Sequence, residues 1–265
     1  MAGFSGFAVR AVAHRGALLL CLLVLTGCVT STQGVFTDPP EPEKALRQRV
    51  ELARKYIGEG NWENAKRNLK QAAAIDPNSA EVHEAFALVY QSTGEAELAE
   101  QNYKKAIRLD HTLSRARNNY ATFLYAQQRY SEAEEQLEAV VKDPLYSARP
   151  QAFVNLGLCR LQLTDKGGAE EAFERALTMD RTNVVALLEA AELRFAAGDV
   201  RAAERHYGVY RTAVRKQSSR GLWLGVRLAQ AIGDRNAESS YAMALRNLYP
   251  DSPEYRTYRR TQGGG

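Results

Sequence analysis

Small side chains recur along this chain at a nearly constant interval, and this register limits the possible folds more than any other feature. An alanine returns every 34 residues, with one interval of 36, at Ala65, Ala99, Ala133, Ala169, Ala203 and Ala237. A second set of small residues keeps the same intervals, at Ala53, Ala87, Ala121, Gly157, Ala191 and Gly225. A third position is bulky in every unit, at Leu69, Tyr103, Leu137, Phe173, Tyr207 and Tyr241. This register predicts a stack of helical hairpins, each packed only on its neighbours.

The residue types explain the register. Small side chains where two helices of a hairpin meet let their axes approach to about 8–10 Å, and a bulky side chain fills the space between hairpins. A 34-residue period of this kind is the signature of tetratricopeptide repeats. We therefore expect an all-α, right-handed superhelix of about six helix-turn-helix repeats over residues 44–250. The expected repeats are 46–79, 80–113, 114–149, 150–183, 184–217 and 218–250, and the two extra residues near 142–150 predict a longer loop or a longer helix.

The N-terminus reads as a targeting segment. Arg10 and Arg15 precede an apolar run over residues 17–25, which is the pattern of a secretory signal peptide. The run is shorter than the roughly 20 residues of a membrane span. We expect residues 1–27 to be cleaved. Residues 28–43 are polar and proline-rich, a composition that favours a flexible tether over a folded segment. Residues 251–265 form a polar C-terminal tail.

The signal segment ends in Leu25, Thr26, Gly27 and Cys28. This sequence resembles the bacterial lipobox, in which small residues precede the cysteine that is lipidated. The resemblance implies a lipid anchor on Cys28, and Val29, where aspartate would favour inner-membrane retention, implies the periplasmic face of the outer membrane. The alternative is an ordinary signal peptide with a coincidental cysteine.

Composition and motifs argue against catalysis and nucleic-acid binding. The chain has 35 basic and 31 acidic residues, and removing Arg10 and Arg15 leaves it near neutrality, without the basic excess of a nucleic-acid binder. His83, His111 and His206 fall in different repeats, and Cys159 is the one cysteine after Cys28. We find no zinc spacing, phosphate-binding loop or nucleophile elbow. We therefore expect no cofactor, no metal, no small-molecule substrate and no enzymatic activity.

The expected concave surface offers a candidate protein-binding site. It is lined mainly by the first helix of each repeat, and we expect positions 5, 9 and 12 of a repeat to face it. The candidate partner-binding residues are Val50, Arg54, Ile57, Leu88, Asn118 and Tyr125. Exposed apolar side chains in such a groove favour an extended peptide or an amphipathic helix as ligand. The alternative is that a tight superhelix or a flanking helix buries them.

Several segments outside the general repeat pattern carry a more specific resemblance. They are residues 118–125, 129–133, 143–146, 155–158, 224–229 and 248–255. Together with the lipobox they resemble the type IV pilus biogenesis lipoproteins, the pilotins of the PilF/PilW family. The resemblance implies an outer-membrane lipoprotein that binds secretin subunits and promotes their localisation and multimerisation, with Cys28 lipidated and no catalytic residues. Two alternatives stay open: an adaptor lipoprotein for another periplasmic machine, such as cell-wall enzyme regulation, and a hydrolase built on the repeats.

Overall fold

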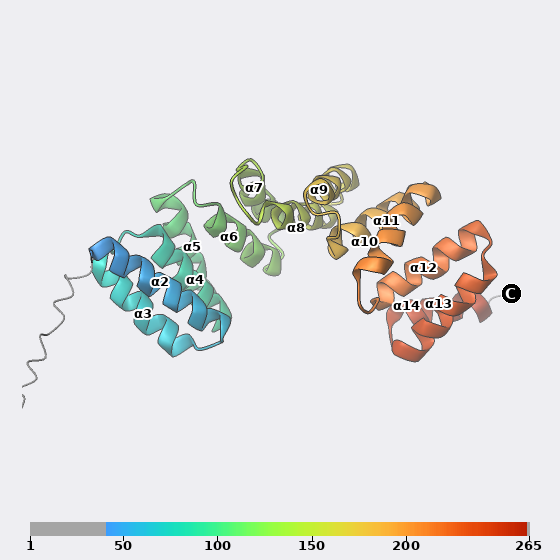
Figure 1. Ribbon diagram of the computed structural model, residues 1–265, viewed down its shortest axis with the longest axis horizontal. Helices are drawn as coiled ribbons and strands as arrows, with labels where there is room; N and C mark the ends of the chain where they lie inside the picture. The colour runs from blue at the N-terminus through green and yellow to red at the C-terminus, as the bar shows by residue number, and fades with distance from the viewer. Residues whose placement is uncertain (1–40, 264–265) are drawn as a thin grey trace, which may run out of the picture. The chain divides into compact units, whose positions relative to one another are not determined.

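The computed structural model describes residues 41–263, and within that range the chain is helical without a strand (Figure 1). The signal peptide, Cys28 and most of the expected tether lie outside the described residues. The helices are α2 (Pro42–Gly58), α3 (Trp62–Ile75), α4 (Ala80–Ser92), α5 (Ala96–Leu109), α6 (Ser114–Ala126), α7 (Tyr130–Val140), α8 (Arg149–Gln162), α9 (Lys166–Met179), α10 (Val184–Ala196), α11 (Val200–Ala213), α12 (Ser219–Ile232), α13 (Arg235–Leu248) and α14 (Pro253–Gly263).

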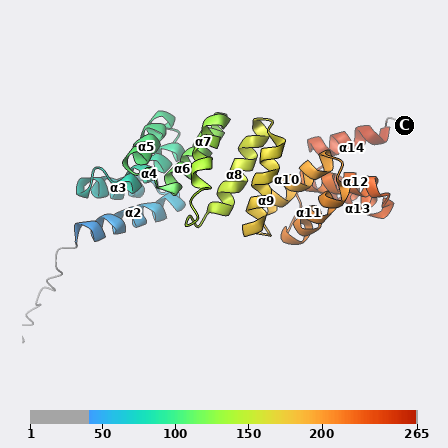
Figure 2. The same ribbon diagram turned by 90° about the horizontal axis from the view of Figure 1, so that it is seen from above.

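Helices α2 to α13 form six hairpins that follow one another in chain order (Figure 2). The even-numbered helix of each pair is called helix A below, and the odd-numbered one helix B. From α4 onward, each helix A packs on its own helix B and on the helix B before it, because both faces of a hairpin carry apolar side chains. The expected all-α fold of about six helix-turn-helix repeats is confirmed.

The turn between helix A and helix B has one recurring requirement. Four of the six turns contain a glycine with positive φ, at Gly60, Gly94, Gly198 and Gly233. Glycine adopts this left-handed conformation without the steric cost that a side chain brings. In the third and fourth hairpins Gln128 and Thr164 hold the same conformation, at φ values of 60° and 66°, so the turn geometry is kept where the sequence does not favour it.

The small residues of the register lie where the hairpin helices meet. Ala65, Ala99, Ala133, Ala169 and Ala203 are fully buried. The bulky residues of the register pack beside them and are also buried, at Leu69, Tyr103, Leu137, Phe173 and Tyr207. Close approach is evident at Gly157, where an added Cβ would lie 2.6 Å from the ring of Phe173. The alternation of small and large side chains is therefore a packing rule of this fold.

The two extra residues of the third repeat form a loop. Helix α7 ends at Val140, and α8 begins only at Arg149. Asp143 organises the connection: its carboxylate accepts hydrogen bonds from the Ser114 hydroxyl at 2.6 Å and from the Leu145 backbone N–H at 2.9 Å. The Leu145 side chain is 91% exposed. Of the two sequence-based alternatives for residues 142–150, the longer loop is the one observed.

The chain departs from a simple six-hairpin stack at its C-terminal end. The polar tail contains helix α14, which contacts α12 and α13. Tyr258 of α14 packs edge-on against Trp223 of α12, with ring centroids 6.3 Å apart. Among the described residues, no helix combines the length and the apolarity that a membrane crossing needs.

Candidate partner-binding groove

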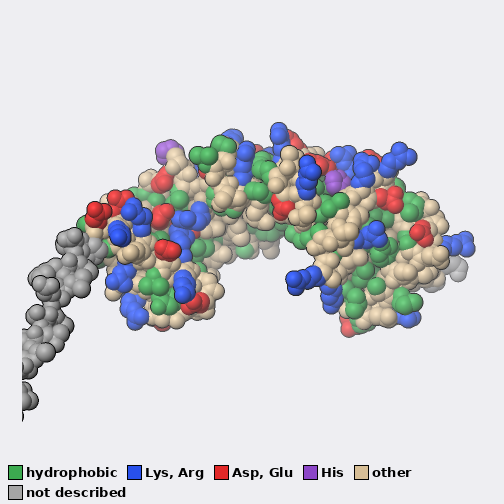
Figure 3. Space-filling model, viewed as in Figure 1, with side chains coloured by type: hydrophobic (Ala, Val, Ile, Leu, Met, Phe, Trp, Pro, Cys, Tyr) green, Lys and Arg blue, Asp and Glu red, His purple; other side chains and the backbone are tan. Residues whose placement is uncertain are grey.

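Successive A helices lie side by side along one face of the stack, with direct contacts from α4 to α6, from α6 to α8 and from α10 to α12. Their neighbouring positions bring together side chains that are 30 to 37 residues apart in sequence. Figure 3 shows charged side chains of both signs interspersed over the visible face. Ion pairs join neighbouring A helices, α2 with α4 and α10 with α12, so the properties of the A-helix face depend on how its charges pair.

The structure corrects the interpretation of Val50. Its side chain is 2% exposed and packs with Ala72 and Val82. Val50 is thus a core residue of the first hairpin and does not line an open groove. The reason is geometric: position 5 of a repeat faces the junction with neighbouring helices, and the equivalent Val154 and Leu222 are buried as well.

Arg54 lies at the edge of the face, but its charge is already paired. Its guanidinium donates to the carboxylate of Glu84 on α4, with an N–O distance of 2.5 Å. The Glu84 side chain is fully buried and also accepts from the Asn119 amide at 2.7 Å. Arg115 of α6 lies 3.6 Å from the same carboxylate. A buried charge needs such partners because desolvation alone would be costly, so this cluster ties α2, α4 and α6 together.

Ile57 and Leu88 retain partly exposed apolar surface. Ile57 packs against the cluster of Ala53, Ala65 and Leu69, and Leu88 packs against a different cluster farther along the chain. Both side chains are half-buried. They provide apolar surface on adjacent A helices, α2 and α4, as the groove interpretation requires.

Tyr125 lines a distinct feature between α6 and α8, and Asn118 contacts another residue of its lining, Asn155. A hollow of about 60 Å³ opens there, lined by Ala121, Thr122, Tyr125, Leu137, Asn155, Leu158 and Cys159. The Asn155 amide donates to Asn118 Oδ1 at 3.4 Å on its rim. Burial raises the pKa of the Cys159 thiol to about 12, so the thiol stays protonated at neutral pH. The predicted residues therefore fall into two areas: Arg54, Ile57 and Leu88 on α2 and α4, and Asn118 and Tyr125 at the α6–α8 hollow.

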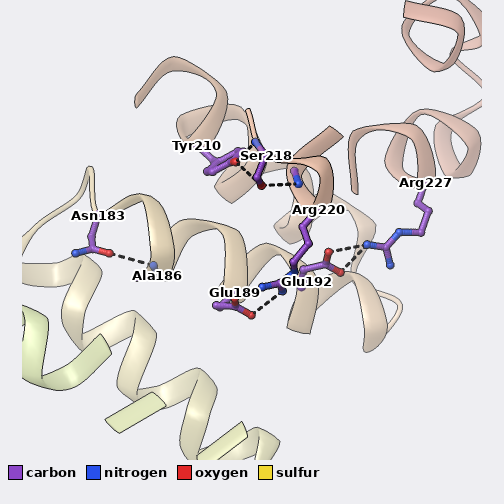
Figure 4. Close-up of polar contacts among 9 residues, drawn as sticks. Asn183, Ala186, Glu189, Glu192, Tyr210, Ser218, Arg220 and Arg227 are labelled. Carbon is purple, nitrogen blue, oxygen red and sulfur yellow. Dashed lines mark hydrogen bonds and ion pairs between the residues drawn. The ribbon is translucent and has the colours of Figure 1, made fainter. Parts of the chain in front are cut away.

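Sequence reasoning missed a second set of paired charges on the C-terminal A helices. Arg220 donates two hydrogen bonds to Glu189, at 2.6 and 3.0 Å, and Arg227 donates to both oxygens of Glu192 at 2.7 Å (Figure 4). The Arg227 guanidinium also lies over the ring of Trp223, 5.5 Å from its centroid. The sequence contains one signal for these pairs, which is the spacing of opposite charges on consecutive A helices. Glu189 and Arg220 are 31 residues apart, and Glu192 and Arg227 are 35 residues apart.

Two of the three histidines in the described part of the chain, His83 and His206, contact neighbouring polar groups. His83 contacts Asn102 and the Pro77 carbonyl at 3.0 Å each, and His206 contacts Glu174 at 3.1 Å. Within residues 41–263 no group of three or more histidine, cysteine or acidic side chains is placed to hold a metal ion.

Comparison with known proteins shows which other proteins share this architecture. Tetratricopeptide-repeat family profiles match residues 80–112 and 121–184. The crystal structure of PilW, described as a widely conserved type IV pilus biogenesis factor, has the same fold, with a TM-score of 0.68 at 24% identity, covering 81% of this chain and 98% of that one. An uncharacterized Haemophilus influenzae protein is 27% identical over 172 residues, 65% of this chain and 94% of its own length.

Similarity to one further protein spans nearly the whole sequence. The type IV pilus assembly protein PilF of Pseudomonas aeruginosa is 38% identical over 247 residues, which cover 92% of this chain and 98% of that protein. A solved structure of Pseudomonas aeruginosa PilF superimposes with a TM-score of 0.79 at 37% identity, covering 83% of this chain and 99% of that one. With this extent of similarity in both sequence and fold, the chain belongs to the PilF family of tetratricopeptide-repeat proteins that serve type IV pilus biogenesis.

Proposed function

We propose that this protein is an outer-membrane lipoprotein that binds secretin subunits and promotes their outer-membrane localisation and multimerisation for type IV pilus biogenesis. The observation that carries the proposal is the similarity to a type IV pilus assembly protein over 92% of the chain. The repeat architecture supports it, because stacked hairpins offer an extended surface suited to holding another polypeptide.

The lipid anchor in this proposal is on Cys28. It is supported by the charged, apolar and small-residue segments that precede this cysteine, ending in Leu25, Thr26 and Gly27. Several acyl chains provide a lasting anchor, because each buried methylene contributes about 0.8 kcal/mol. The anchor would hold the repeats at the periplasmic face of the outer membrane, where secretin subunits assemble.

The secretin contact in this proposal includes the face formed by α2 and α4. These are the two A helices closest in sequence to the anchor, and Ile57 and Leu88 contribute half-exposed apolar surface there. Arg54 orders this face through its pair with Glu84. Helical grooves usually recognise a peptide through apolar contacts, with fixed polar groups beside them.

The first experiment separates binding from location. In cells without this gene, we expect fewer detergent-resistant secretin multimers and secretin in the inner-membrane fraction. Restoring the wild-type gene should reverse both effects. The Cys28→Ala variant should keep secretin binding in pull-downs and lose outer-membrane localisation of both proteins. Wild-type secretin multimers and localisation in the deletion strain would refute the proposal. Capture of cell-wall enzymes in place of secretin would favour the adaptor alternative.

The second experiment tests the α2–α4 face. Replacing both Ile57 and Leu88 by Asp should reduce secretin multimers, because charges would be placed in an apolar contact. The matched control replaces Ile75 and Leu98, which are exposed aliphatic residues on the B helices α3 and α5, in the same way. Equal effects of the two double variants would argue against a specific role of this face.

A further inference from the structure

The hollow between α6 and α8 differs from the rest of the A-helix face because none of its lining residues is charged. Buried Leu137 and Cys159 line it together with half-buried Tyr125 and Leu158, and exposed Thr122 lies beside them. The volume of about 60 Å³ is several times the roughly 10–15 Å³ that one water molecule needs on this measure. The hollow therefore has room for a single aliphatic side chain.

Asn155 lines this hollow, and its side chain together with that of its hydrogen-bond partner Asn118 can pair with a peptide backbone. Asn155 donates to Asn118 Oδ1 at 3.4 Å, and its own Oδ1 accepts from Gln151 at 3.0 Å. Within residues 41–263 no hydrogen bond uses the Asn118 amide nitrogen as donor. A peptide bond supplies both an acceptor and a donor for such amides, whereas a hydrocarbon chain would cover them without partners.

Several charged side chains on either side of the hollow form ion pairs within the protein. Towards the N-terminus, Arg54 pairs with Glu84, and towards the C-terminus, Arg220 and Arg227 pair with acidic residues of α10. Each of these arginines is neutralised by its own partner, and no charged residue lines the hollow itself. Recognition at the hollow would then depend on shape and on the asparagine amides.

We propose that the α6–α8 hollow receives one aliphatic side chain from an uncharged segment of the secretin subunit, with Asn118 and Asn155 pairing with the backbone of that segment. This inference rests on the proposed function and adds to it a second contact, distinct from the α2–α4 face, with a defined ligand chemistry.

The structure offers a closely matched pair of variants for the test. Thr122 of α6 and Thr178 of α9 are both exposed, and each donates its hydroxyl to the backbone carbonyl four residues earlier, at 3.0 and 2.9 Å. Of these two threonines, only Thr122 lines the hollow. Thr122→Phe should fill the hollow and reduce capture of the secretin subunit by about tenfold, the effect of losing one well-packed anchor. Thr178→Phe should leave capture unchanged, and circular dichroism checks that both variants fold.

The outcomes distinguish this inference from the proposed function. If the wild-type protein captures no secretin, the proposed function fails, and this inference fails with it. If wild type and Thr122→Phe capture secretin equally well, the proposed function stands and the role of the hollow is refuted. Capture that changes less than about twofold between about 0.05 and 0.5 M salt is expected for an uncharged contact. A steep loss with salt would contradict the assignment of an uncharged segment.

A photo-crosslinking amino acid at position 122 identifies the ligand directly. In cells, we expect it to cross-link to secretin at a peptide that contains Leu, Ile or Val and no charged residue beside the cross-linked position. The same amino acid at position 178 is the control and should give no secretin product. Cross-linking from position 122 to a charged peptide, to lipid or to no secretin would overturn the inference.

Discussion

At the scale of single residues, the packing of the hairpins depends on positions where the neighbouring side chains leave no room for a Cβ atom. An added Cβ at Gly157 would come within 2.6–2.9 Å of three ring atoms of Phe173, which is itself fully buried. A fixed aromatic ring cannot yield easily, because core packing is close to crystal density. By contrast, an added Cβ at Gly208 of α11 would meet nothing within 4 Å. Two helical glycines thus differ entirely in what they tolerate.

This contrast gives a paired prediction. Gly157→Ala should destabilise the protein by about 1–3 kcal/mol, the usual cost of overpacking. Gly208→Ala should be neutral or stabilising by up to about 1 kcal/mol, because alanine is the better helix former. Urea unfolding followed by circular dichroism measures both changes. Equal effects of the two substitutions would show that the ring contact at Gly157 does not limit packing.

At the scale of helices, ion pairs join one element to the next. Arg129, at the start of α7, donates to Glu100 of α5 at 2.9 Å and to Glu132 at 2.6 and 2.7 Å. The hydrogen bond from Arg129 is the main cause that lowers the pKa of Glu100 from 4.5 to about 2. Since this pKa is lower in the folded state, the pair stabilises the fold above about pH 4.5 and loses that contribution as the pH falls towards 2.

The pH dependence can be tested by removing the cation. Arg129→Met should lower the urea midpoint at neutral pH and reduce its dependence on pH between 4.5 and about 2. Arg108→Met is the control, because Arg108 is exposed on α5 and forms none of the ion pairs recorded in the described part of the chain. An unchanged acid dependence in Arg129→Met would assign the loss of stability at low pH to other carboxylates.

The C-terminal helix shows where sequence reasoning reaches its limit. Helix α14 contacts the stack through Tyr258, which packs on Trp223, and Tyr255 stacks on Tyr258 within the helix. The helix is otherwise polar, so it lacks the apolar periodicity from which helices are predicted. The six hairpins were predictable because small and large residues repeat in register. Val50 was misassigned because the register gives helix faces but not how closely neighbouring hairpins approach, and the α6–α8 hollow depends on the same spacing.

Removal of this helix tests its role as a cap. A chain ending at Ser252 should unfold at a lower temperature, because terminal repeats need a covering element. Trp223 would lose its contact with Tyr258, and its fluorescence should shift to longer wavelength as water reaches the ring. Using a Trp62→Phe background isolates the Trp223 signal. Unchanged melting and emission would show that α14 does not stabilise α12.

At the scale of the whole chain, the core is a series of clusters of unequal size. The first hairpin depends on two small clusters, around Leu69 and around Val50. The central and C-terminal hairpins share two larger clusters, and Phe153 packs against both of them. In a solenoid each unit is stabilised mainly by its neighbours, so the end with the smaller clusters should open first.

Two core truncations test this order. Leu69→Ala should increase hydrogen exchange chiefly in α2 and α3 and leave α8 to α10 protected. Phe173→Ala should lower protection across the central and C-terminal hairpins, with a cost of about 3–5 kcal/mol for the lost ring. Exchange measured by mass spectrometry, peptide by peptide, distinguishes the two patterns. A uniform response to Leu69→Ala would indicate that the stack unfolds as one unit.

The buried thiol of Cys159 has a practical consequence. Its exposed fraction is 1%, and burial raises its pKa to about 12, so an alkylating reagent reacts with it only when α8 separates from its neighbours. The rate at which Cys159 is modified in the native protein therefore reports how often the central repeats open. A ligand bound over this thiol would slow its modification, so binding could be followed without an engineered label.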